Sequence, residues 1–153
     1  MKYSVDTSAI LDGWRRNYSP DVFPGFWDRL DALISEGSLR ATDEVLVELE
    51  RKDDEVYAWA RKRTDLFVPI DSDIQIAVTD ILSSYEKLLD TRANRSSADP
   101  FVIALAKTNK CAVVTAERAT NSPLRPNIPD VCNALGVPVM TLLQLARGEG
   151  WRF

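Results

Sequence analysis

The stretch from Ser96 to Glu117 constrains the fold more than any other, because it predicts a buried helix that leads directly into a buried strand. Ser97 suits the N-cap of that helix and Asp99 suits its first turn. Residues 101–106 are nearly all apolar, so the helix is expected to be buried. Cys111–Thr115 is a short apolar run of the kind that a central parallel strand makes. A helix and a strand that are both buried predict a sheet covered by helices, which is the α/β class.

The rest of the chain repeats this alternation of strand-like and helical patterns. Right-handed crossovers between such elements give a parallel sheet with helices on both faces. Pro138 predicts that the last strand lies at a sheet edge, because proline cannot donate to a ladder. No repeat or linker divides the sequence, so one domain over residues 1–153 is expected. The candidate strands are 2–6, 39–41, 66–70, 111–115 and 137–140, and the candidate helices are 23–34, 43–49, 53–63, 74–88, 97–106, 129–135 and 141–147.

Acidic side chains fall where the carboxyl ends of these strands are expected to meet. Asp6 ends the first strand, Asp99 stands in the first turn of the buried helix, and Glu117 follows the strand after it. In open α/β sheets this edge is where ligands bind. Glu48, on a neighbouring helix, can add a fourth carboxylate. Taken singly, Asp6 suits a helix N-cap and Glu48 suits a solvated helix face, so neither predicts a site alone.

Several carboxylates in one cleft repel one another unless some are protonated or a hard cation lies among them. Oxygen-only ligation favours Mg²⁺ or Mn²⁺ over Zn²⁺. The chain contains no histidine, which excludes the usual general base, the histidine-containing nucleophilic triads and most zinc sites. Any hydrolytic chemistry must therefore be carried by carboxylates, hydroxyls or a bound cation.

Charge and cysteine content narrow the class of protein further. The formal net charge is −4, so binding to a nucleic acid requires a local basic patch or bound metal ions. The two cysteines, Cys111 and Cys132, lack metal-site spacing and are expected to be buried thiols. The sequence starts directly with a strand pattern and has no apolar run of membrane-spanning length, so a soluble, cytoplasmic protein with no membrane partner is expected.

Together these features resemble a known family, the PIN domain, in their order and spacing over nearly the whole chain. The segments that carry the resemblance are Val5–Leu11, the pair Glu48–Leu49, Ala98–Ala106 and Val113–Glu117. More narrowly, the tail formed by Arg125–Cys132 and Leu135–Val137 is similar to a bacterial and archaeal PIN-like subgroup whose members are mostly uncharacterised.

The resemblance implies a three-layer α/β/α fold with a central, mostly parallel sheet. It further implies a ribonuclease that holds one or two Mg²⁺ or Mn²⁺ ions, as in VapC-type toxins of toxin–antitoxin pairs. The partners it implies are an RNA substrate, a cognate antitoxin and a second copy in a homodimer. Asp6, Glu48 and Asp99 fall on the family's first three acidic positions. Glu117 takes the fourth, where the family usually has aspartate, and Asp130 or Asp71 can assist.

Residues of two further kinds are expected around these acids. Hydroxyl groups can orient a carboxylate or a water molecule, although satisfying nearby backbone groups is their commoner role when buried. Arginines near the cleft can contact RNA phosphates. The hydroxyl candidates are Thr7, Ser8 and Thr115, and the arginine candidates are Arg95, Arg118 and Arg125.

The alternative hypothesis is a catalytically silent PIN-like module that binds RNA or a protein partner. Glu117 in place of aspartate favours it, whereas four acidic positions disfavour it. A haloacid-dehalogenase-type phosphatase expects a second acid two residues after the first, where this chain has Ser8. A receiver domain expects paired acids near the first strand and a lysine after a late strand, and neither arrangement is convincing here. The six scattered glycines form no phosphate-binding loop.

Overall fold

The computed structural model describes residues 1–86 and 98–153. These residues form a parallel five-stranded sheet in the order β3-β2-β1-β4-β5. Tyr3 of β1 pairs with Leu39 of β2 on one side and with Ala112 of β4 on the other. The strands are β1 Tyr3–Val5, β2 Leu39–Thr42, β3 Phe67–Val68, β4 Ala112–Val114 and β5 Val139–Met140. The predicted parallel sheet is confirmed, and β5 is an edge strand as Pro138 predicted.

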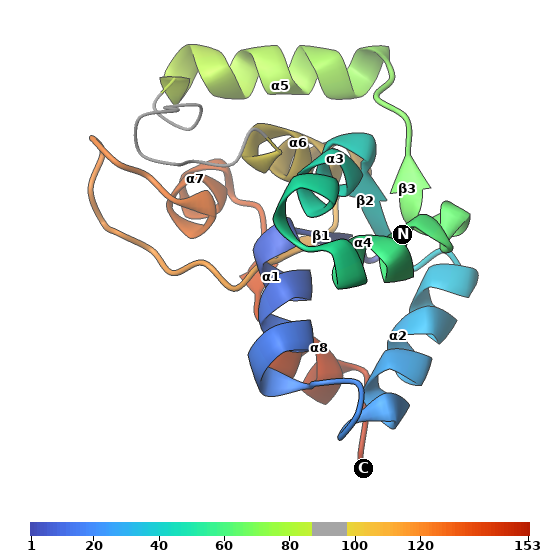
Figure 1. Cartoon of the computed structure of the whole chain (residues 1–153). Helices are drawn as coiled ribbons and strands as arrows, with labels where there is room; N and C mark the ends of the chain where they lie inside the picture. Colours follow the sequence, from blue (N-terminus) through green and yellow to red (C-terminus); the bar gives the residue numbers. More distant parts are fainter. Residues whose placement is uncertain (87–97) are drawn as a thin grey trace.

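Helices cover both faces of this sheet, giving the predicted three-layer α/β/α arrangement. Figure 1 shows α5 and α6 above the sheet and α2 and α8 below it. The α-helices are α1 Thr7–Asp12, α2 Pro24–Ser35, α3 Asp43–Lys52, α4 Asp54–Arg61, α5 Ser72–Ser84, α6 Asp99–Asn109, α7 Ile128–Leu135 and α8 Leu142–Gly148. A π-helical turn, Gly13–Asn17, extends α1, and a 3₁₀ turn, Thr64–Leu66, precedes β3.

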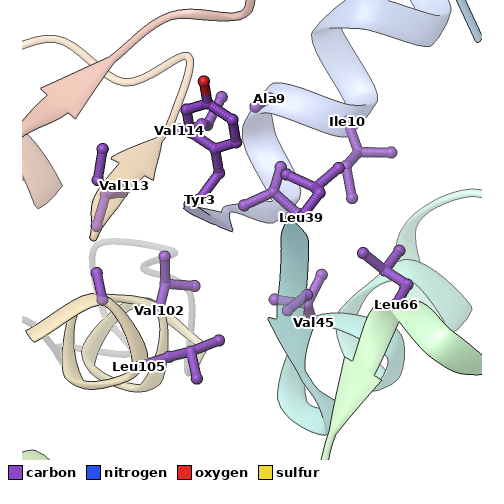
Figure 2. Close-up of a cluster of buried hydrophobic side chains, with 14 of the residues drawn as sticks. Tyr3, Ala9, Ile10, Leu39, Val45, Leu66, Val102, Leu105, Val113 and Val114 are labelled. Carbon is purple, nitrogen blue, oxygen red and sulfur yellow. The ribbon is translucent and has the colours of Figure 1, made fainter. Parts of the chain in front are cut away.

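The central helix α6 is buried along most of its length, as its apolar sequence predicted. Val102, Ile103 and Leu105 are at most 2% exposed. Figure 2 shows Val102 and Leu105 in one cluster with side chains from β1, β2 and β4. The Ser4 hydroxyl on β1 donates to the Val102 carbonyl at 2.8 Å, which fixes α6 against the central strand. Since α6 leads antiparallel into β4, its N-terminus lies at the carboxyl edge of the sheet.

Some element boundaries differ from the predicted ones. The strand predicted over 66–70 is only Phe67–Val68, because Leu66 belongs to the preceding 3₁₀ turn. Ala98 occupies the N-cap position of α6, and Ser97, the predicted cap, lies outside the described residues. Helix α5 ends at Ser84, whereas the periodicity predicted a helix to position 88, which is also outside the described residues.

Both cysteines, Cys111 and Cys132, are buried free thiols, as predicted. Within the part of the chain that the structure describes, no helix is both long and apolar enough to cross a membrane.

Candidate active site

Asp6 is the buried carboxylate at the centre of the carboxyl edge. It directly follows β1, is 2% exposed, and its backbone amide donates to the Val114 carbonyl of β4 at 2.9 Å. It occupies the N-cap position of α1, but its side chain makes no capping bond. Instead, Oδ2 accepts from Ser8 Oγ at 2.5 Å and from Thr115 Oγ1 at 2.9 Å. The carboxylate is therefore held by two hydroxyls, one from the first turn of α1 and one from the chain after β4.

The same two hydroxyls also organise the chain beyond β4. Ser8 Oγ accepts from the Ala116 amide at 3.1 Å, and Thr115 Oγ1 accepts from the Glu117 amide at 3.1 Å. Each hydroxyl thus donates to the carboxylate while accepting from the backbone. Both residues were expected from the sequence to orient the acids, and both contact Asp6. The orientation of Asp6 and the start of the following loop depend on one hydrogen-bond network.

Glu48 of α3 is buried beside this network. It is 1% exposed, so its interpretation as a solvated helix residue was wrong. Its Oε2 accepts from Thr7 Oγ1 at 3.1 Å, and Oε1 lies 3.3 Å from the Lys52 ammonium. Lys52 was not among the predicted site residues, although the spacing of four residues between Glu48 and Lys52 is the spacing of helical ion pairs. The Lys52 side chain is half-exposed, so this ion pair joins the buried Glu48 carboxylate to a cation at the protein surface.

Electrostatic effects show that Asp6 and Glu48 interact. Burial is the largest influence on Asp6 and raises the pKa of its carboxyl above the ordinary value. Hydrogen bonds from Ser8 and Thr115 lower that pKa, and the negative charge of Glu48 raises it. The net effect is a raised pKa for Asp6. The carboxylates of Asp6 and Glu48 therefore repel each other in a buried environment, where water screens their charges only weakly.

Glu117 reaches the same region from the chain beyond β4. It is partly buried, and its Oε2 accepts from the Ile128 amide at the start of α7 at 3.0 Å. On α7, burial and, to a smaller extent, the negative charges of Asp6 and Glu117 together raise the pKa of the Cys132 thiol to about 12. The charges of Asp6 and Glu117 both act on the Cys132 thiol, so both carboxylates lie within electrostatic range of it.

Asp99 is the first residue of α6 and is 1% exposed. Because the α6 N-terminus lies at the carboxyl edge, Asp99 is at the same edge as Asp6 and Glu117. The four acidic candidates thus come from four separate segments of the chain. The expected strand directions predicted Asp6, Asp99 and Glu117 at this carboxyl edge, and a neighbouring helix was expected to add Glu48.

The four acidic side chains offer only carboxylate oxygens, which are the ligand atoms that a hard divalent cation prefers. Within residues 1–86 and 98–153, however, no group of three or more acidic or thiol side chains is arranged to hold a metal ion together. Joint ligation by the four acids therefore requires side-chain rotation from the arrangement described above.

Two further acids that were expected to assist have local hydrogen-bonding roles. Asp130 accepts from the backbone amides of Thr120, Asn121 and Asn127 at 2.8–2.9 Å. Burial acts to raise the pKa of Asp130, but these hydrogen bonds outweigh it and the pKa is lowered. Asp71 accepts from the Ile74 amide at 2.9 Å and caps α5. Both carboxylates stabilise local backbone, at the 120–127 loop and at a helix start.

The arginine candidates are not gathered around the acids in the same way. Arg118 and Arg125 are both exposed, and Arg118 lines a cavity that also includes Glu117. Arg95 lies outside the described residues. Of the predicted arginines, Arg118 is therefore the one that the structure places next to the acidic site.

Comparisons with known proteins support the fold. A family model described as "Domain of unknown function (DUF4411)" matches residues 3–153. Among solved structures, FitAcB from Neisseria gonorrhoeae is 18% identical with a TM-score of 0.55, over 94% of this chain and 99% of that one. VapBC2 from Rickettsia felis, bound to a DNA fragment from its promoter, is 11% identical with a TM-score of 0.55, over 92% and 98%. No curated protein matches significantly. The fold shared with these structures is the PIN-like α/β/α fold.

Proposed function

This chain belongs to the family of the domain of unknown function DUF4411, and on that premise we propose that it is a PIN-like endoribonuclease that depends on Mg²⁺ or Mn²⁺. The observation that carries the proposal is the burial of Asp6, Glu48 and Asp99, each at most 2% exposed, at the ligand-binding edge of the sheet. Burying several carboxylates costs stability, and sites that bind cations or perform catalysis are where such costs occur.

The metal ligands in this proposal are Asp6, Glu48, Asp99 and Glu117. A bound divalent ion would lower the pKa of a coordinated water and polarise the scissile phosphate. The chain's own groups do the rest. Ser8 and Thr115 orient the Asp6 carboxylate by donating to its Oδ2 atom.

Cationic side chains supply the contacts to a polyanion. Lys52 neutralises part of the charge of Glu48 and is half-exposed, so its ammonium can also contact a phosphate. Arg118, exposed beside Glu117, has the same role at the other end of the acidic site, with Arg95 and Arg125 as further candidates. These contacts counteract the repulsion between RNA and an acidic protein.

The biological role in this proposal is that of a toxin with a cognate antitoxin. It rests on the shared fold with FitAcB and with VapBC2. The same reasoning suggests that a second copy forms a homodimer. Fold alone does not determine function, so these partners need their own test by co-expression with the neighbouring gene product.

Two observations favour the alternative, a silent PIN-like module that binds RNA or protein. No three acids within the described ranges are spaced for a shared metal ion, and Glu117 already accepts a hydrogen bond from Ile128. An RNA cleavage assay distinguishes the nuclease from the silent module.

The test is incubation of the purified chain with structured and single-stranded RNAs in Mn²⁺ or Mg²⁺, beside an EDTA control. The double variant Asp6→Asn, Asp99→Asn should lower the cleavage rate by about a hundredfold or more, since loss even of indirect metal-site partners costs about 10–100-fold. Asp28→Asn, an exposed carboxylate on α2, is the matched control and should cleave normally. Cleavage that persists in EDTA or in the double variant would contradict the proposal.

A further inference from the structure

A cavity of about 450 Å³ opens next to the acidic site. It lies between the α1 end, the chain after β4 and the start of α8, and it shares Thr115 and Glu117 with the acidic site. Its volume falls in the range of small-molecule sites, roughly 300–1,000 Å³. The carboxylate site and this cavity are therefore two parts of one surface.

One wall of the cavity is formed at the π-helical turn Gly13–Asn17. Asn17 and Tyr18, at the end of that turn, both line the cavity. The Tyr18 amide donates to the Gly13 carbonyl at 2.8 Å, which closes the wider turn. A Cβ on Gly13 would lie 2.9 Å from the Leu142 side chain of α8, so the turn packs tightly there. Single π-turns are rare and occur frequently at functional sites.

Tyr18 is held in place by its neighbours. Its ring is stacked on Phe26 with 4.0 Å between centroids and 4° between the planes. Its backbone carbonyl accepts from Trp27 Nε1 at 2.5 Å. The cavity wall at Tyr18 is therefore rigid, as a preformed binding site requires.

The charges around the cavity limit what can occupy it. Asp12, Glu117 and Arg118 all line it, so two carboxylates face one guanidinium, and the excess negative charge disfavours a phosphate or another anion inside. Ala9 and Leu142 add apolar surface. The occupant should be a flat, neutral group with hydrogen-bond donors and an apolar face. A nucleobase has these properties, whereas its phosphate would lie on the solvent side of the cavity, against the exposed side chain of Arg118.

Asp12 determines which base suits the cavity best. Its two carboxylate oxygens can accept together from two adjacent donors, and among the bases guanine has such a pair, N1–H and N2–H₂, on its Watson–Crick edge. Asp12 contacts Arg16 only at 3.8 Å, and the Arg16 side chain is largely exposed while that of Asp12 is partly exposed. Such a pair is weak, so Asp12 can exchange it for a base.

We infer that this cavity binds one unpaired guanine of a single-stranded RNA, with Asp12 on its Watson–Crick edge and Asn17 and Tyr18 on the wall. The inference rests on the proposed function in taking RNA as the ligand. It goes further by assigning a base-specific subsite that adjoins the acidic site and shares Glu117 with it.

The test measures binding in EDTA, so that cleavage does not enter. The probes are fluorescent single-stranded uridine heptamers that carry guanine, adenine, cytosine or uracil at the central position. The guanine heptamer should bind the wild-type chain roughly 5- to 150-fold more tightly than the uracil heptamer, the range for one bidentate base contact. In Asp12→Asn that preference should fall to about twofold or less, because the amide replaces one acceptor with a donor.

A control variant, a second test variant and a competitor keep the result interpretable. Asp28→Asn changes the same charge on α2 and should retain the guanine preference. Asn17→Ala tests the wall independently and should weaken binding of the guanine heptamer severalfold. Guanosine monophosphate, added as a competitor, separates a strand subsite from a free-nucleotide site. It should compete weakly, whereas competition stronger than that of the heptamer would overturn the assignment to RNA.

The outcomes also separate this inference from the nuclease proposal. Equal binding of all four heptamers, no binding up to millimolar protein, or a guanine preference that survives Asp12→Asn would each overturn the inference. Guanine-selective binding without cleavage in Mn²⁺ would retain the subsite and remove the nuclease. Metal-dependent cleavage without base preference would retain the nuclease and remove the guanine subsite.

Discussion

The Asp6 carboxylate is surrounded by groups that act on its pKa in opposite directions. Burial and the charge of Glu48 raise that pKa, while hydrogen bonds from Ser8 and Thr115 lower it. Because the net effect is a raised pKa, the unfolded chain releases this proton at a lower pH than the folded protein does. Stability is therefore fully retained below the ordinary pKa of 3.8 and falls as the pH rises through the folded-state value.

We expect Asp6→Asn to raise the melting temperature of the metal-free protein at pH 7, by about 2–4 °C for each kcal/mol gained. The amide oxygen can still accept from Ser8 and Thr115, but no charge is buried. The measurement is thermal unfolding in EDTA at pH 7 and near pH 3, where the gain should shrink because Asp6 is largely protonated in both states. A variant that is less stable than wild type at pH 7, with Asp28→Asn unchanged, would contradict this account.

Helix α7 connects the 116–127 loop to the acidic site. It begins at Ile128, whose amide donates to Glu117, and it carries Cys132 near the carboxylates of Asp6 and Glu117. It ends at Gly136, whose φ of +72° is in the left-handed region that favours glycine. Gly148, in α8, has no such conformation, and a Cβ added at either glycine would meet no atom within 4 Å.

These two glycines make a matched pair for testing backbone conformation. Gly136→Ala should destabilise the protein by about 1–2 kcal/mol, the cost of a left-handed conformation for a residue with a Cβ. Gly148→Ala should be neutral or stabilising by up to about 1 kcal/mol, because alanine favours a helix. Urea unfolding of both variants measures the difference. Equal effects of the two substitutions would show that the α7 end does not depend on its left-handed residue.

The molecule as a whole brings four acids to one edge of the sheet from distant parts of the chain. Burial and mutual repulsion of these carboxylates lower the stability of the fold, and a bound cation would relieve that loss. If Mn²⁺ binds the folded protein, it must also stabilise it, by about 2.7 kcal/mol at a free concentration of about 100 Kd. That gain corresponds to a rise in melting temperature of several degrees for a chain of this length.

We therefore expect the melting temperature to rise with Mn²⁺ for the wild type and for Asp28→Asn. It should not rise for the double variant Asp6→Asn, Asp99→Asn, which lacks two of the proposed ligands. The measurement is a series of thermal scans from micromolar to millimolar Mn²⁺, with Ca²⁺ as a second ion. A wild-type melting temperature that is independent of Mn²⁺ would favour the silent module over the nuclease.

Local patterns in the sequence were enough to predict the fold class. The apolar run through Val102 and Leu105 predicted a buried helix, and the strand after it predicted a parallel sheet. The helix predicted over 129–135 is α7, and Asp6 and Glu117 were predicted at the carboxyl edge from strand direction. These predictions succeeded because periodicity, turn conformation and chain direction depend on neighbouring residues.

Contacts between distant segments were decided only by the tertiary structure. Glu48 has the sequence context of a solvated residue, yet it is buried because α3 packs beside α1 and presents it to Thr7. The π-turn at Gly13 has no periodic signal, because its wider turn depends on packing against Leu142 of α8. The cavity arises from segments more than a hundred residues apart. Burial and cavity shape depend on which surfaces meet after the chain folds, and local sequence does not contain that information.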